Sequence, residues 1–175
     1  MSKTALKKEL SRMSAEQISE LVLELYEARP EAREYLDFYI KPDINAKLQK
    51  AQSAIRKEIN RSSRGRSKMR STRLRRLIKD IASLNPGDEP VCDVMTFTIT
   101  EVCALDSDIY IKETTRRALV KLLTETVMAA DAAGMLDVYL PRIRSAVEGM
   151  SSSFFHRNEL KSQLCEALAD AVESL

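Results

Sequence analysis

The sequence predicts an all-α fold, and three observations lead to that prediction. Glycine and proline account for only four and five of the 175 residues, so turn formers are few. Leucine, alanine, glutamate, lysine and arginine, which favour helices, are abundant. Apolar residues recur at spacings of three and four along most of the chain, as they do on the buried face of a helix.

Three helices are expected in the first quarter of the chain. The first covers residues 3–13. Ser14 and Gln17 have the spacing of a capping box, so a second helix is expected to begin there. Its apolar stripe consists of Ile18, Leu21, Val22 and Leu25. Pro30 disfavours helical geometry at the preceding residue and suits the first position of a third helix, which is expected to end before Pro42.

Two further helices are expected on either side of a polar turn at residues 61–66. Asp43 can cap the first of them, and its apolar positions are Ile44, Leu48, Ala51, Ile55 and Ile59. The second is expected over residues 68–79, with an apolar stripe of Leu74, Leu77, Ile78, Ile81 and Leu84. Lys68, Arg75, Arg76 and Lys79 fall opposite that stripe and are expected to face water.

The whole chain, residues 1–175, is expected to form one helical domain, with a candidate sub-boundary at residues 85–90, the clearest break in the pattern. The stretch after this break is ambiguous. Residues 94–100 alternate as a strand would, but the apolar residues around them also fit a helical face. Because a lone strand would leave backbone groups without partners, we favour a helix.

The last third of the chain predicts three more helices. Residues 106–108 offer caps for a long helix that ends at Gly134. The next segment contains Pro141 and is therefore kinked or begins late. The final helix has an apolar face of Leu160, Leu164, Leu168, Ala171 and Leu175. Eight or nine helices joined by short turns are expected to form antiparallel hairpins, either as a compact bundle or as a HEAT-like helical array.

Charge is distributed unevenly. The segment from Arg61 to Lys79 holds nine of the 28 lysines and arginines and no acidic residue, which leaves 19 basic and 26 acidic residues elsewhere. The segment is therefore a candidate binding surface. Its basic residues are Arg61, Arg64, Arg66, Lys68, Arg70, Arg73, Arg75, Arg76 and Lys79.

The sequence offers little material for catalysis, and we expect no cofactor and no metal site. His156 is the only histidine, so a site with several histidine ligands cannot form within one chain. No glycine-rich phosphate-binding motif occurs. Six acidic residues between Glu20 and Asp37 could in principle bind a hard cation, but charges opposite an apolar stripe are usually a solvated face. The three cysteines lack metal-binding spacing and are interpreted as reduced, packed thiols.

Aromatic residues gather near the third helix. Tyr26, Tyr35, Phe38 and Tyr39 are four of the nine aromatic residues. They could form a platform for base stacking. Because Tyr35 and Tyr39 are four residues apart on an apolar stripe, core packing with the hydroxyls at the rim is favoured.

No apolar run with the length of a signal peptide core or a membrane span occurs near residues 1–8. We therefore expect a cytoplasmic protein without a membrane span.

Two stretches carry a resemblance to known proteins. Residues 2–10 and 21–43, with the patterns Tyr-x-Ala-Arg, Tyr-x-Asp-Phe-Tyr and Pro-Asp, resemble the amino-terminal signature of a small, functionally uncharacterised family of bacterial helical proteins. The resemblance implies a bacterial cytoplasmic protein and transfers no catalytic residue.

Two functions remain open at the level of the sequence. The first is a non-enzymatic helical interaction module or scaffold with a protein partner, for which the basic segment at 61–79 is a docking surface. The alternative is nucleic-acid binding by that segment, in which seven arginines and two lysines suit phosphate contacts.

Overall fold

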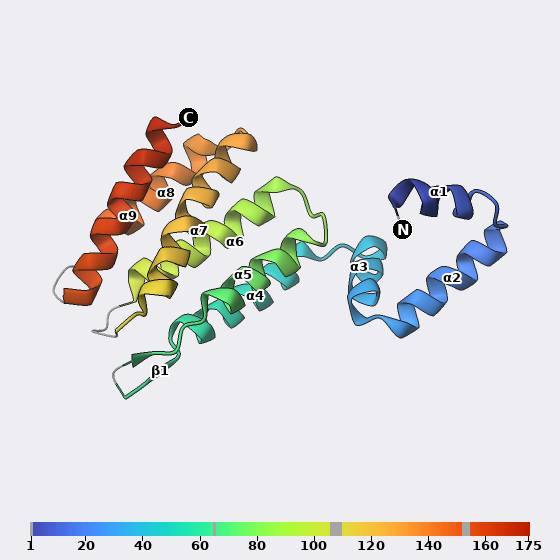
Figure 1. The fold of residues 1–175 in the computed structure, drawn as a ribbon, viewed down its shortest axis with the longest axis horizontal. Helices are drawn as coiled ribbons and strands as arrows, with labels where there is room; N and C mark the ends of the chain where they lie inside the picture. Colours follow the sequence, from blue (N-terminus) through green and yellow to red (C-terminus); the bar gives the residue numbers. More distant parts are fainter. Residues whose placement is uncertain (1, 65, 106–109, 152–154) are drawn as a thin grey trace. The chain divides into compact units, whose positions relative to one another are not determined.

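The computed structural model describes residues 2–64, 66–105, 110–151 and 155–175, without the side chains of Ser63, Arg66, Ser67 and His156. These residues form nine helices and one short β-hairpin, so the fold is all-α (Figure 1). The helices are α1 (Lys3–Leu10), α2 (Ala15–Ala28), α3 (Pro30–Ile40), α4 (Ile44–Ile59), α5 (Ser71–Ala82), α6 (Asp88–Ala104), α7 (Glu113–Ala132), α8 (Leu136–Glu148) and α9 (Phe155–Glu173). The strands are β1 (Ser62–Ser63) and β2 (Arg66–Ser67). The caps expected at 106–108 lie outside the described residues.

The chain divides into two compact units. The first is Met1–Asp43, with α1 to α3, and the second is Ile44–Leu175, with α4 to α9. Residues 85–90, the candidate sub-boundary, lie inside the second unit, between α5 and α6.

The helix boundaries of the first unit follow the predicted signals. Ser14 and Gln17 form the complete capping box at the start of α2, and Pro30 is the first residue of α3. The Tyr26 hydroxyl donates a hydrogen bond of 2.9 Å to Oδ1 of Asp37, and the Arg33 guanidinium lies 5.0 Å from the centre of the Tyr26 ring. Polar contacts therefore join α2 to α3.

The first unit has almost no core. Among residues 2–43 only Phe38 is buried, so the expectation that Tyr35 and Tyr39 pack in a core is wrong. Tyr39 is 74% exposed. The apolar stripe of α2 is also largely exposed, although its residues share one face as predicted.

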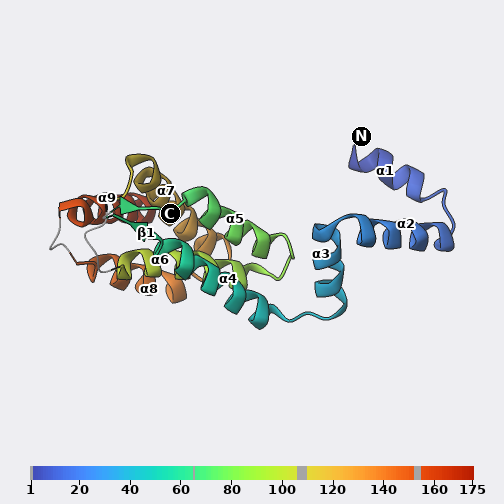
Figure 2. The same ribbon diagram turned by 90° about the horizontal axis from the view of Figure 1, so that it is seen from below.

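Three stacked helical hairpins make up the second unit, α4–α5, α6–α7 and α8–α9 (Figures 1 and 2). Helices α4, α6 and α8 pack side by side in one layer, and α5, α7 and α9 pack side by side in the other. This is the arrangement of an α-solenoid, in which each hairpin mainly contacts its neighbours. Of the two predicted architectures, the second unit therefore adopts the helical array.

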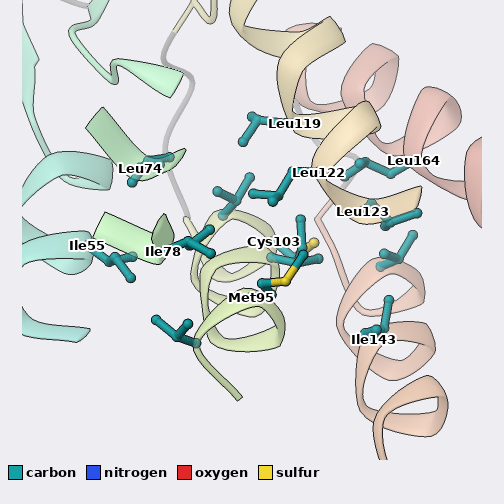
Figure 3. Close-up of a cluster of buried hydrophobic side chains, with 14 of the residues drawn as sticks. Ile55, Leu74, Ile78, Met95, Cys103, Leu119, Leu122, Leu123, Ile143 and Leu164 are labelled. Atoms are coloured by element: carbon teal, nitrogen blue, oxygen red, sulfur yellow. The ribbon is translucent and has the colours of Figure 1, made fainter. Parts of the chain in front are cut away.

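Helix α6 lies at the centre of this array and packs against α4, α5, α7 and α8. Its ambiguous stretch at 94–100 is helical, as favoured. Figure 3 shows Met95 and Cys103 of α6 among apolar side chains from both neighbouring hairpins, including Ile78 of α5 and Ile143 of α8. The core of the second unit is therefore continuous across all three hairpins.

The carboxyl-terminal helices follow the sequence signals, apart from the position of Leu175. Gly134 has a φ of 66°, and the amide of Met135 donates to the carbonyl of Ala130, so α7 ends in a Schellman motif. Of the two alternatives for the segment with Pro141, the late start is wrong, because α8 begins at Leu136 and contains Pro141. Leu175 is 47% exposed, because α9 ends at Glu173, so its expected place on the buried face of that helix is wrong.

None of the helices in the described residues is long and apolar enough to cross a membrane.

The core packing gives a stability prediction. Leu74 of α5 is fully buried, so Leu74→Ala should lower the free energy of unfolding by about 2 to 5 kcal/mol, since the cavity cost adds to the lost transfer energy. Leu77→Ala removes a side chain of the same helix that is slightly more exposed than Leu74, so its cost shows how far the surrounding residues close the cavity. Leu175→Ala is the control and should change stability by less than about 0.5 kcal/mol. Urea unfolding followed by circular dichroism measures all three, and equal losses for Leu74 and Leu175 would contradict the described core.

Candidate functional site

The first candidate surface is the basic hairpin, which we define as residues 44–82, comprising α4, the β-hairpin and α5. It contains 13 lysines and arginines but only two acidic residues, Glu58 and Asp80. Its net charge is +11, whereas the rest of the chain has 15 basic and 24 acidic residues. Helices α4 and α5 pack against each other, so these charges share one element of the fold (Figure 1).

Three arginines of the basic hairpin are engaged in internal ion pairs. Arg56 lies 3.0 Å from Glu101 of α6, and Arg75 lies 2.6 Å from Glu125 of α7. These two pairs tie the basic hairpin to the neighbouring helical hairpin. The third arginine, Arg70, pairs within the basic hairpin.

Glu58 receives Arg70 on both of its oxygens. The Arg70 guanidinium donates at 2.9 and 2.8 Å, and the Arg70 backbone amide donates at 3.0 Å. Glu58 is only 6% exposed, and the hydrogen bonds from Arg70 hold the pKa of its carboxyl below the ordinary value. This contact joins the end of α4 to the start of α5.

Helix α5 begins later than predicted. Arg70 has extended geometry, with a φ of −108° and a ψ of 103°, and helix α5 begins at Ser71 instead of Lys68. The Lys68 amide donates to the carbonyl of Arg61 at 2.7 Å, so Lys68 continues the extended chain after β2 and is not part of the helix. Strands β1 and β2 pair antiparallel, with Ser62 opposite Ser67 and Ser63 opposite Arg66.

The remaining predicted cations point outward. Arg61, Arg64, Lys68, Arg73, Arg76 and Lys79 are all exposed. None of these six forms an ion pair with another described residue. The side chain of Arg66 is not among those that the structure describes. Of the nine predicted residues, the structure therefore assigns two to internal pairs and places six on the exposed surface.

Sequence reasoning missed two cations on α4. Lys50 and Lys57 are exposed and lie seven residues apart, so they share a face, and Arg61 continues it beyond the end of the helix. Their position opposite the buried Ala51 and Ile55 could have been found from the spacing. The spacing alone did not reveal that α4 packs against α5 and that these lysines therefore belong to the same helical hairpin as the cations of α5.

The second candidate surface is the apolar stripe of α2, which we define as Ile18, Leu21, Val22 and Leu25. The last three side chains are 41%, 39% and 48% exposed. Eight of the thirteen exposed large hydrophobic side chains in the described residues belong to the first unit. Such a concentration within a quarter of the chain is typical of an interaction surface.

The described residues hold no other clear site. They contain no group of three or more histidine, cysteine or acidic side chains arranged to hold a metal ion. The three thiols are free, and burial raises the pKa of Cys103 to about 12. Cys165 is exposed rather than packed, which corrects the expectation for that residue. The surface depressions include one between α7 and α9, lined by Arg117, Lys121 and Glu166 among others.

A family model described as "Family of unknown function (DUF6155)" matches residues 1–167 of the chain. No curated protein and no solved structure shows significant similarity to the chain.

The Glu58–Arg70 contact gives a pH-dependent prediction. Glu58→Gln should lower the free energy of unfolding at pH 7 by about 1 to 3 kcal/mol, because charge-assisted hydrogen bonds from Arg70 are lost. The folded-state pKa of Glu58 is depressed, so its stabilisation is complete above the ordinary value of 4.5 and is lost as pH falls through the folded pKa. Urea unfolding at pH 7 and pH 3 should therefore show a difference between wild type and variant that shrinks in acid. Asp80→Asn is the exposed control, and an equal effect there would contradict the assignment.

Proposed function

Because the chain belongs to the family of unknown function DUF6155, which supplies no activity to carry over, we propose a function from the surfaces themselves: a non-enzymatic interaction module that binds a protein partner. The apolar stripe of α2 is the observation that carries this proposal. The family resemblance and the free cysteines support a bacterial cytoplasmic setting as part of the proposal.

The first unit needs a partner on physical grounds. A segment of about 40 residues rarely folds alone without a metal, a disulfide or an oligomeric contact. Residues 2–43 bury only one side chain and contain no cysteine, so apolar contact with a partner would supply burial that this unit does not provide by itself. An amphipathic helix with exposed apolar residues at spacings of three and four suits the helix-in-groove mode of recognition.

The charges of α2 define the partner further. Glu20, Glu24 and Glu27 lie on the face opposite the stripe. Ser19 and Tyr26 lie along one edge of the stripe, so that edge carries no charge. The partner therefore offers an apolar groove, and the acidic face of α2 remains in water.

The test uses variants of α2 in the full chain. Leu21→Gln, Val22→Gln and Leu25→Gln together replace three of the four apolar side chains of the stripe by a residue that favours helices. Glu20→Gln, Glu24→Gln and Glu27→Gln form the matched control on the opposite face. Affinity purification from the native cell, with quantitative mass spectrometry, should recover a protein with wild type and with the control, but at least about tenfold less with the stripe variant.

Unfolding in urea checks that the stripe variant leaves the second unit intact, as expected because that unit has its own core. Equal recovery of every protein with the two variants would remove the proposal, as would recovery of nucleic acid alone.

A further inference from the structure

The outward cations of the basic hairpin are unlike an ordinary helix surface. Each arginine directed at a neighbouring hairpin has a carboxylate partner, Glu101 for Arg56 and Glu125 for Arg75. Eight exposed cations form no ion pair with other described residues: Lys50, Lys57, Arg61, Arg64, Lys68, Arg73, Arg76 and Lys79. Repulsion among like charges disfavours the folded state, so internal stability does not account for this surface.

The position of the basic hairpin in the array also fails to account for its charge. A terminal hairpin of a helical array needs a polar outer face for solubility, but that face can carry either sign. The hairpin at the other end, α8–α9, has four basic and six acidic residues over 136–173. The end at α4–α5 has 13 basic and two acidic residues. A single sign at one end therefore points to an anionic ligand.

The chemistry of the surface distinguishes between classes of anionic ligand. None of the exposed large hydrophobic side chains lies in residues 44–82, whereas protein interfaces are usually centred on buried apolar and aromatic anchors. Residues 44–82 contain no Phe, Tyr, Trp or His, so they offer no ring on which an unpaired base could stack. Phosphates displayed on the outside of a duplex need neither feature.

We propose that the basic hairpin binds double-stranded nucleic acid through its phosphates, and that Lys50 and Lys57 of α4 belong to the site. Arg73, Arg76 and Lys79 supply cations from α5, and Arg61, Arg64 and Lys68 supply them from the β-hairpin. Guanidinium groups can donate two hydrogen bonds to one phosphate. The proposed contacts go to phosphates, which carry no sequence information, so we expect binding that depends little on the base sequence.

This inference goes beyond the protein-binding function and uses a different unit of the chain. The site lies in Ile44–Leu175, and the stripe lies in Met1–Asp43. The stripe variant should therefore retain full duplex affinity, which separates failure of one proposal from failure of the other.

The test measures fluorescence anisotropy of a labelled 20-base-pair DNA duplex of arbitrary sequence with the full chain. With about six phosphate contacts, affinity should fall on the order of 10³-fold between 50 and 200 mM salt. Lys50→Gln with Lys57→Gln should weaken binding about tenfold or more at 100 mM salt and reduce the salt slope by about 2. The control, Lys121→Gln with Arg144→Gln, removes two exposed cations from α7 and α8 and should leave affinity within about twofold.

Competition identifies the class of ligand. The unlabelled duplex should displace the label at lower concentration than its single strand or polyglutamate. Absence of duplex binding at 50 mM salt, or equal losses for the two double variants, would overturn the proposal. Tighter binding of polyglutamate would assign the surface to an acidic protein, and tighter binding of the single strand would contradict the duplex assignment.

Discussion

The burial of α6 on nearly every side is the constraint on which the second unit depends. Its apolar residues face the α4–α5 hairpin on one side and the α7 and α8 helices on the other. Even its threonines are enclosed, and the Thr98 hydroxyl donates to the carbonyl of Val94, four residues earlier. Because one helix is enclosed by both neighbouring hairpins, the hairpins must stack in register around it. The orientation of the basic hairpin at the end of the array follows from that packing.

Signals that act within a few residues were readable from the sequence. The Ser14 capping box, Pro30 and Gly134 each mark a helix end because their effect is local. The stretch at 94–100 was ambiguous because a helix buried all round lacks the usual periodicity. The start of α5 was misplaced because Lys68 and Arg70 contact Arg61 and Glu58, and the spacing of apolar residues does not reveal these contacts. For the candidate site, the sequence indicated the cations of one segment but neither their internal pairs nor the contribution of α4.

The two units differ in the chemistry that they expose. The first unit exposes apolar side chains, and most of the charged residues on its helices are acidic. It buries little of its own surface. The second encloses its apolar residues and presents a basic end without exposed large hydrophobic side chains. Apolar contact and phosphate attraction differ in their response to salt, since salt screens charges but leaves apolar burial largely intact. The two partners proposed for this chain would therefore bind by different chemistry and would not compete for one surface.

The array also makes stability uneven along the second unit. An internal hairpin is supported by interfaces on both sides, whereas α4–α5 has one such interface within its unit, with α6–α7. Charge repulsion lowers the cost of opening this end further. Its backbone amides should thus exchange with solvent through local fraying, without unfolding of the whole array. A polyanion that neutralises the outward cations would oppose the fraying, so the occupancy of the surface and the order of the terminal hairpin are thermodynamically linked.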